Sequence, residues 1–227
     1  MLIGLLRFVA KVLVREDWRI VRDRITFELR QITRREEFSP SLATQLLLVS
    51  GEDHRHRRHY GFDPYAICRA IWRRVIRQSR EGASTIEQQI ARVITNRFEV
   101  TIRRKVKEVL LAALIAESFP KALLPSVYLR IGYYGWRMNG YSQACLRLGF
   151  DPRKLSFEEA ASLVARLKYP QPRVMPECRH HQIRRRSNHL LVLYQHHKLD
   201  DTYEHLLCQS IYISPVNPEF ARSLPGC

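Results

Sequence analysis

The sequence has little that would stabilise a small disulfide scaffold or a zinc ribbon. Its five cysteines are scattered over 227 residues, and no two of them show the CxxC spacing of a zinc ribbon. Because five is odd, at least one cysteine lacks a partner within the chain. This argues against a disulfide framework and leaves the redox compartment open. Strand-like alternation, internal repeats and low-complexity segments are also lacking, which favours a mostly α fold.

A long apolar run is lacking as well. The apolar N-terminal stretch, residues 1–14, carries Arg7 and Lys11 and is shorter than the roughly 20 residues of a membrane-spanning helix. No small-residue cleavage site follows it, which weakens a signal-peptide interpretation. Its leucines and valines fall near one helical face. Two interpretations stay open: an in-plane membrane anchor, or an amphipathic helix packed on the domain.

Acidic residues are few. The chain has 22 Asp and Glu against 38 Lys and Arg, a formal charge of +16 and a pI near 10.1. Such a charge calls for an anionic partner, and nucleic acid, anionic lipid or a pyrophosphate-bearing substrate would each satisfy it. The apolar share of 45% supports a core, and the length fits one domain with a small appendage.

Caps and apolar spacing predict the helices. We expect helices over 39–51, 64–80, 84–95, 101–117, 157–169 and 183–194, with N-caps at Ser39, Ser84, Thr101 and Ser156. Residues 16–36 are expected to be a solvated linker or helix, 132–140 a loop, and Pro125 the kink or end of any helix around it. On the helix over 101–117 the expected inward face is Ile102, Val106, Val109, Leu110, Ala113 and Leu114, and Glu108 lies opposite it.

Residues 52–108 concentrate the polar side chains that can carry chemistry. A glycosyl transfer needs a carboxylate to take the acceptor hydroxyl proton, and a departing pyrophosphate needs cations. Glu52, on a turn after the first of these helices and next to Asp53, is the candidate base. Each feature also has a plain structural interpretation: a solvated loop acid for Glu52, a surface ion pair for Arg104 and Glu108, and solvated glutamines at 88–89.

His54, His56 and His59 lie close enough in sequence to raise the question of a metal site. Their HxHxxH spacing differs from the helical i, i+4 pair of a zinc protease, and no carboxylate follows at the expected place. We therefore expect no zinc site.

Three motifs in order resemble the peptidoglycan glycosyltransferases, the transglycosylase domains of penicillin-binding proteins and their monofunctional relatives. The motif EDxxFxxHxG matches residues 52–61, GxSTIxQQ matches 82–89, and RKxxE matches 104–108. Residues 121–129 loosely match KxxxLxxxYL, and Arg185 and Arg186 match an arginine pair of a fifth motif. The resemblance covers roughly residues 40–195. It implies a lysozyme-like, mostly α single catalytic domain with a small membrane-proximal lobe near the first motif.

The resemblance also implies roles for individual residues. Glu52 matches the base that deprotonates the 4-hydroxyl of the acceptor sugar, and Glu108 matches a second essential acid near the leaving pyrophosphate. Arg69, Arg92 and Lys105 would contact donor phosphates, and Arg104 would orient Glu108. The remaining residues expected to shape the cleft or bind substrate are Asp53, His59, Ser84, Thr85, Gln88 and Gln89.

Several positions depart from the family pattern. His56 replaces the usual Phe, Arg92 replaces a lysine, and Arg130 replaces an Asn. Val100 stands where the family often has an arginine, for which Arg97 or Arg103 could substitute. These departures suggest a divergent member with altered substrate or lowered activity.

The sequence thus predicts an inverting glycosyltransferase that polymerises lipid II and releases undecaprenyl pyrophosphate. We expect a segment 1–36 that associates with membrane, a catalytic domain 37–200 and a tail 201–227. Its expected partners are lipid II, growing glycan and an anionic membrane at the outer face of the bacterial inner membrane, without nucleic acid; a divalent cation such as Mg²⁺ or Mn²⁺ is permitted. Two alternatives stay open: a catalytically silent basic protein that binds membrane or a partner, and a lysozyme-like hydrolase.

Overall fold

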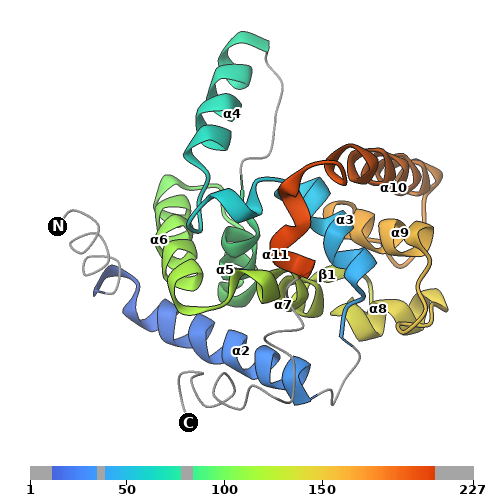
Figure 1. Ribbon diagram of the computed structural model, residues 1–227, viewed down its shortest axis with the longest axis horizontal. Helices are drawn as coiled ribbons and strands as arrows, with labels where there is room; N and C mark the ends of the chain where they lie inside the picture. The colour runs from blue at the N-terminus through green and yellow to red at the C-terminus, as the bar shows by residue number, and fades with distance from the viewer. Residues whose placement is uncertain (1–11, 35–38, 78–83, 208–227) are drawn as a thin grey trace.

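A computed structural model describes residues 12–34, 39–77 and 84–207 of the chain. Within these ranges the protein is mostly α, which confirms the predicted fold class (Figure 1). Residues 1–11 of the predicted anchor, Gly82 and Ala83 of the second motif, and residues 208–227 of the predicted tail lie outside the described residues.

Two groups of helices build the body around one core. The first comprises α3 (Leu42–Glu52), α9 (Phe157–Lys168) and α10 (Glu177–His197), which pack on one another. The second comprises α2 (Arg15–Arg34), α5 (Ile86–Thr95), α6 (Ile102–Ser118) and α7 (Leu124–Ile131). Contacts between α3 and α7 join the groups, and the helix α4 (Pro64–Arg77) projects from the body (Figure 1). The three motifs therefore lie on the end of α3 and the loop after it, at the start of α5 and on the first half of α6.

Small elements complete the chain. The region predicted as a loop, 132–140, contains the antiparallel strands β1 (Tyr133–Gly135) and β2 (Met138–Asn139), followed by α8 (Tyr141–Leu148). Short 3-10 helices occur at η1 (His56–Arg58), η2 (Lys121–Leu123) and η3 (Asp201–Tyr203), and the last described helix is α11 (Glu204–Leu207). Pro125 stands in the first turn of α7, where its missing N–H costs no helical hydrogen bond.

The segment predicted as a solvated linker or helix is the helix α2, and it is part of the core. Val21, Ile25 and Leu29 recur every four residues and are fully buried against the α5, α6 and α7 side of the molecule. The buried Glu28 of α2 also pairs with Arg130 of α7, with 2.7 Å between Nε and Oε2. The departure at Arg130 thus serves a buried contact between helices.

Helix ends differ from the prediction where a side chain has a better partner. Ser41, rather than Ser39, caps α3, because its hydroxyl accepts from the Thr44 N–H. Glu52 is the last residue of α3 rather than part of the following turn. Helix α10 runs over Glu177–His197 and is longer than the predicted 183–194. The predicted caps Thr101 and Ser156 are confirmed.

The second motif begins its helix one residue later than predicted. Thr85 is the N-cap of α5: its hydroxyl accepts from the Gln88 N–H and donates to the Gly61 carbonyl at 2.6 Å. Ser84 is not the predicted N-cap, and Glu87 turns into the core instead of reaching back to the start of the helix. The hydroxyl of Ser84 is thereby free of the cap and accepts a hydrogen bond from Lys105.

The predicted inward face of α6 is wrong over its first half. Ile102 and Val106 are 85% and 51% exposed, whereas Glu108 is 3% exposed. The buried face continues through Leu111, Ala112, Leu114 and Ile115. Glu108 can be buried because three cations neutralise it, as described below, and apolar periodicity alone does not register such a group.

Gly61 of the first motif is expected to tolerate no side chain. Its φ is +85°, and a Cβ would overlap the Ala112 carbonyl of α6. Replacing Gly61 with Ala should lower the free energy of unfolding by about 3 kcal/mol, because left-handed strain adds to the overlap. Gly149→Ala is the control, since Gly149 has φ +70° but open space around it, and should cost about 1–2 kcal/mol. Urea unfolding of both variants compares them; equal losses would contradict a close approach at Gly61.

Candidate active site

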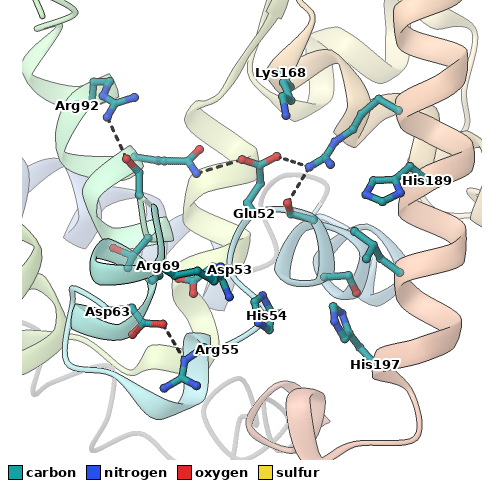
Figure 2. A pocket seen from close by; sticks show the side chains of 18 residues that line it. Glu52, Asp53, His54, Arg55, Asp63, Arg69, Arg92, Lys168, His189 and His197 are labelled. Atoms are coloured by element: carbon teal, nitrogen blue, oxygen red, sulfur yellow. Dashed lines mark hydrogen bonds and ion pairs between the residues drawn. The ribbon is translucent and has the colours of Figure 1, made fainter. Parts of the chain in front are cut away.

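A cavity of about 590 Å³ lies where α3, α4, α5, α9 and α10 meet. The residues predicted for the site that line it are Glu52, Asp53, Arg69, Ser84, Thr85, Gln89 and Arg92. The other five, His59, Gln88, Arg104, Lys105 and Glu108, are absent from the described lining. Figure 2 shows Glu52 at the centre of the cavity, with Arg92 and Asp53 on its α5 side and His189 on its α10 side.

The carboxylate of Glu52 is held by two neighbours from distant parts of the chain. Gln89 Nε2 of α5 donates to Oε2 at 3.3 Å, and Arg186 Nη2 of α10 donates to Oε1 at 2.8 Å. The same Arg186 nitrogen donates to the Gly51 carbonyl at 2.7 Å (Figure 2). Glu52 keeps 19% of its side chain exposed, so a ligand in the cavity can still reach it. Sequence matching had identified Arg186 only as part of a fifth motif.

Asp53 and His59 serve the frame of the site. Asp53 Oδ2 accepts from the Ile86 N–H at 3.1 Å, and His59 Nε2 lies 3.0 Å from both carboxylate oxygens of Asp53. Both side chains are nearly fully buried. They connect the end of α3, which carries Glu52, to the start of α5. Their predicted part in substrate binding stays a prediction.

Glu108 lies behind the cavity wall, surrounded by three cationic side chains. Arg92 donates to both of its oxygens, at 2.8 and 3.2 Å, Arg104 pairs with Oε1, and Lys105 Nζ lies 3.6 Å from Oε2. Burial disfavours the carboxylate form, but Arg92, Lys105 and Arg104 outweigh it and hold the pKa of Glu108 below its usual range. Glu108 is therefore an anion that orients Arg92, the one member of this group that lines the cavity.

Lys105 supports the same wall. Its ammonium donates to Ser84 Oγ at 3.0 Å and to Gln88 Oε1 at 2.5 Å. Burial, together with Arg92 and Arg104, lowers the pKa of Lys105 despite Glu108. Gln88 is fully buried and so is not the solvated residue of the plain interpretation. It anchors Lys105 beneath Ser84.

The cavity lining also includes basic residues from α4, α9 and α10. Lys168 at the end of α9 and His189 on α10 line the cavity together with Arg186, and Arg69 lines it from α4. Burial and the nearby Arg186 and Lys168 lower the pKa of His189. Lys168 and His189 fall outside the motifs, and no spacing in the sequence signals them. The cavity thus places Arg69, Arg92, Lys168 and Arg186 near the partly exposed carboxylate of Glu52, and such cations can stabilise a departing pyrophosphate.

The position left without an arginine at Val100 is not filled by either predicted substitute. Val100 is 97% exposed. Arg97 pairs with Asp17 of α2 at 2.9 Å, and the exposed Arg103 is absent from the cavity lining. Arg97 thus fixes α2 to the loop after α5, which is a structural use.

A buried group of carboxylates and imidazole comes close to metal-ligand geometry. Asp53, His59 and Glu87 present atoms that all lie within 4.8 Å of one another. The Lys121 ammonium, however, lies 3.3 Å from Glu87 Oε1 and donates to the His59 carbonyl. A cationic side chain thus already neutralises this position, and these residues do not fit a resident metal ion.

Comparison with known proteins places this geometry in a family. The family model described as transglycosylase matches residues 20–195. The chain belongs to the transglycosylase family. The match begins inside α2 and ends inside α10, so it includes every predicted site residue and all of the described cavity lining except His197.

Individual relatives of this transglycosylase agree with the match. Penicillin-binding protein 1A of Neisseria gonorrhoeae is 36% identical over 135 residues, which cover 57% of this chain and 17% of that protein. The protein of the same name from Vibrio cholerae is 35% identical over 125 residues (54% and 15%), and that of Aquifex aeolicus is 38% identical over 124 residues (54% and 17%). The similarity thus spans less than a fifth of the length of each of these relatives.

Among the described residues, no single helix is long and apolar enough to cross a membrane. The pair Ile102–Ser118 and Lys121–Ile131 reaches that length and composition only when taken together, and it is bent by 115°.

Proposed function

We propose that this transglycosylase polymerises a lipid-linked disaccharide, lipid II, into glycan strands with inversion at the anomeric carbon. The observation that carries the proposal is Glu52, a carboxylate reachable from a cavity whose lining also includes Arg69, Arg92 and Lys168. Glu52 and its partners Gln89 and Arg186 come from three helices, so the carboxylate has a fixed direction. Such fixation is what a general base needs.

The proposed step moves one proton and one glycosyl group. Glu52 takes the proton of the acceptor 4-hydroxyl while that oxygen attacks the anomeric carbon of the donor. The bond from this carbon to the pyrophosphate breaks, and undecaprenyl pyrophosphate leaves as an anion. Arg69 and Arg92 lie in the cavity lining where they can stabilise the charge that develops on the leaving oxygens. Lys168, also in the lining, is a further candidate for the same role.

Glu108 acts in this proposal through Arg92. The two hydrogen bonds from Arg92 fix the plane of its guanidinium, and a fixed guanidinium binds phosphate more selectively than a mobile one. A lowered pKa keeps Glu108 ionised, which fits a positioning carboxylate. It does not fit the general acid of a lysozyme-like hydrolase, which requires a raised pKa.

The family resemblance permits a divalent cation. The described cavity lining has no two unpaired carboxylates that could bind one. Glu52 is paired with Arg186 and Asp63 with Arg55, at 2.8 Å each. No step proposed here passes through a metal ion.

The proposed place of action is an anionic membrane surface, at the outer face of the bacterial inner membrane. Helix α4 supports this, because it follows the first motif, projects from the body and exposes Tyr65, Trp72 and Ile76 by more than half (Figure 1). Aromatic and aliphatic side chains of this kind favour a membrane interface. The surplus of positive charge fits anionic lipid headgroups.

The test offers the purified full chain two substrates in separate reactions: lipid II in vesicles, and finished glycan strands without lipid. The proposal expects polymer from lipid II and no cleavage of the strands, as resolved by electrophoresis of labelled glycan. Cleavage of strands by water would identify the lysozyme-like hydrolase instead. Absence of both reactions, with vesicle binding retained, would identify the silent membrane-binding protein.

A further inference from the structure

The last described segment, residues 201–207, lies against the chain on both sides of Glu52. On the near side, Tyr203 of η3 is hydrogen-bonded to Ser50 of α3, two residues before Glu52. Leu206 of α11 is 1% exposed and belongs to the core. Figure 1 shows α11 beside α3. The segment thus packs on the helix that ends in the candidate base.

On the far side, the segment contacts η1, which follows Glu52 by four residues. Arg57 pairs with Asp201 at 2.9 Å and with Glu204 at 2.5 Å, and Arg58 pairs with Asp201 at 2.7 Å. These ion pairs are about half exposed, so each contributes little by itself. They do fix the register of the segment against the first motif.

Between these contacts, a buried histidine joins the segment to the core. His56 is fully buried, its Nδ1 lies 2.9 Å from His205 Nε2, and its Nε2 lies 3.5 Å from Glu87 Oε1. Glu87 is also fully buried and pairs with Lys121. The imidazole that stands where the family has Phe therefore bridges the second motif and residue 205. An apolar ring could make neither contact.

We propose that His205 is a positioning residue of the active site, which docks the segment 201–207 onto His56 and thereby holds the loop that follows Glu52. This inference rests on the proposed function for its kinetic part alone. The docking itself stands on the contacts of Tyr203, His205 and Leu206.

The docked position favours the uncharged form of His205. The groups that face the His56–His205 pair are Glu87, His59, Lys121 and Arg57. Burial, followed by the charges of His56, Lys121 and Arg57, lowers the pKa of His205 to about 3, against about 6.5 in a released segment. Docking is therefore strongest above pH 6.5. Below it, the ratio of docked to released segment falls up to about tenfold per pH unit, until pH approaches 3.

A second histidine pair joins the loop after Glu52 to the end of α10. The rings of His54 and His197 stack at 5.3 Å with an angle of 12° between their planes. Burial is the largest cause of the lowered pKa of each ring. Protonation of this pair also acts on residue 54, so part of the pH dependence of residues 52–59 does not involve His205.

Two substitutions of His205 in the full chain separate the effect of losing the His56–His205 contact from the effect of protonating His205. His205→Leu leaves Nδ1 of His56 without its partner, whereas the side-chain amide of His205→Gln can either donate to or accept from that nitrogen and does not titrate. The control is His181→Leu, at an exposed histidine of α10. The measurements are kcat and KM with lipid II, and hydrogen-exchange protection of residues 52–59 at pH 7.5 and 5.5, corrected for intrinsic exchange rates.

We expect His205→Leu to lower protection of residues 52–59 at pH 7.5 and to lower kcat about 10- to 100-fold, with KM little changed, since a displaced base slows the chemical step. His205→Gln should restore most of the protection of residues 52–59 and most of kcat. Protection in the wild type should fall about tenfold between pH 7.5 and 5.5, and clearly less in His205→Gln.

Unchanged protection in His205→Leu, or the same pH dependence in wild type and His205→Gln, would overturn the inference. An inactive wild type would instead overturn the proposed function. The exchange measurements would still decide whether His205 docks the segment.

Discussion

Glu52→Gln should lower kcat for lipid II polymerisation by about 100- to 10,000-fold, the usual contribution of a general base. The amide can still contact Gln89 and Arg186, but it cannot accept the proton of the acceptor hydroxyl. KM should change little, because the cations that bind the donor stay in place. Single-turnover rates with vesicle-bound lipid II give the comparison.

The matched control for this variant is Glu158→Gln, an exposed glutamate in the first turn of α9. It makes the same chemical change outside the cavity and should leave kcat unchanged. If Glu52→Gln retained more than about a tenth of the wild-type kcat, Glu52 would not be the base. Another carboxylate would then have to be sought.

Glu108→Gln should affect both stability and activity. The substitution leaves Arg92, Arg104 and Lys105 close together without their shared anion. Removing one partner of a buried ion pair costs about 3 kcal/mol. The loss should be smaller here, because the side chains of Arg92 and Lys105 are 28% and 37% exposed. Urea unfolding at pH 7 should show a loss of about 2–3 kcal/mol. The rate should fall as well, because Arg92 loses its orientation.

The pH dependence of that stability difference checks its cause. The pKa of Glu108 is lowered in the folded protein, so its contribution is present above the unfolded value of about 4.5 and is lost as pH falls through the folded pKa. The gap between wild type and Glu108→Gln should therefore be full at pH 7 and should shrink as pH falls below about 4.5. A gap that stayed constant down to pH 3 would show that charge is not what Glu108 contributes.

The helices and the motif residues could be predicted from the sequence, because they depend on local patterns. The caps Thr101 and Ser156 and the start of α4 at Pro64 follow from residue types that act within one turn. The family resemblance placed Glu52, Arg69 and Arg92 in one site before any contact was known, and all three line the cavity.

The partners of those residues could not be predicted, because they depend on contacts between distant parts of the chain. Arg186 binds Glu52 across 134 residues, and His205 meets His56 across 149. The burial of Glu108 was also missed, since apolar spacing assigns a charged residue to the surface. Only the arrangement of Arg92, Arg104 and Lys105 around it explains why it lies inside.

The structure gives a physical reason for two of the departures from the family pattern. His56 would be a buried, unpaired ring without Glu87 and His205, and Arg130 would be a buried charge without Glu28. In each case the substituted residue meets a partner that suits it. These two departures are thus accommodated by buried partners. Arg92, a third departure, lines the cavity and donates to both carboxylate oxygens of Glu108.

The most direct test of the account counts two products in one reaction. Purified wild type and Glu52→Gln are given the same lipid II vesicles, and undecaprenyl pyrophosphate and new glycosidic linkages are both quantified. The account predicts one pyrophosphate for each linkage in the wild type, and a parallel fall of both in Glu52→Gln. Linkages formed equally by both proteins, or no linkage formed by the wild type, would contradict it.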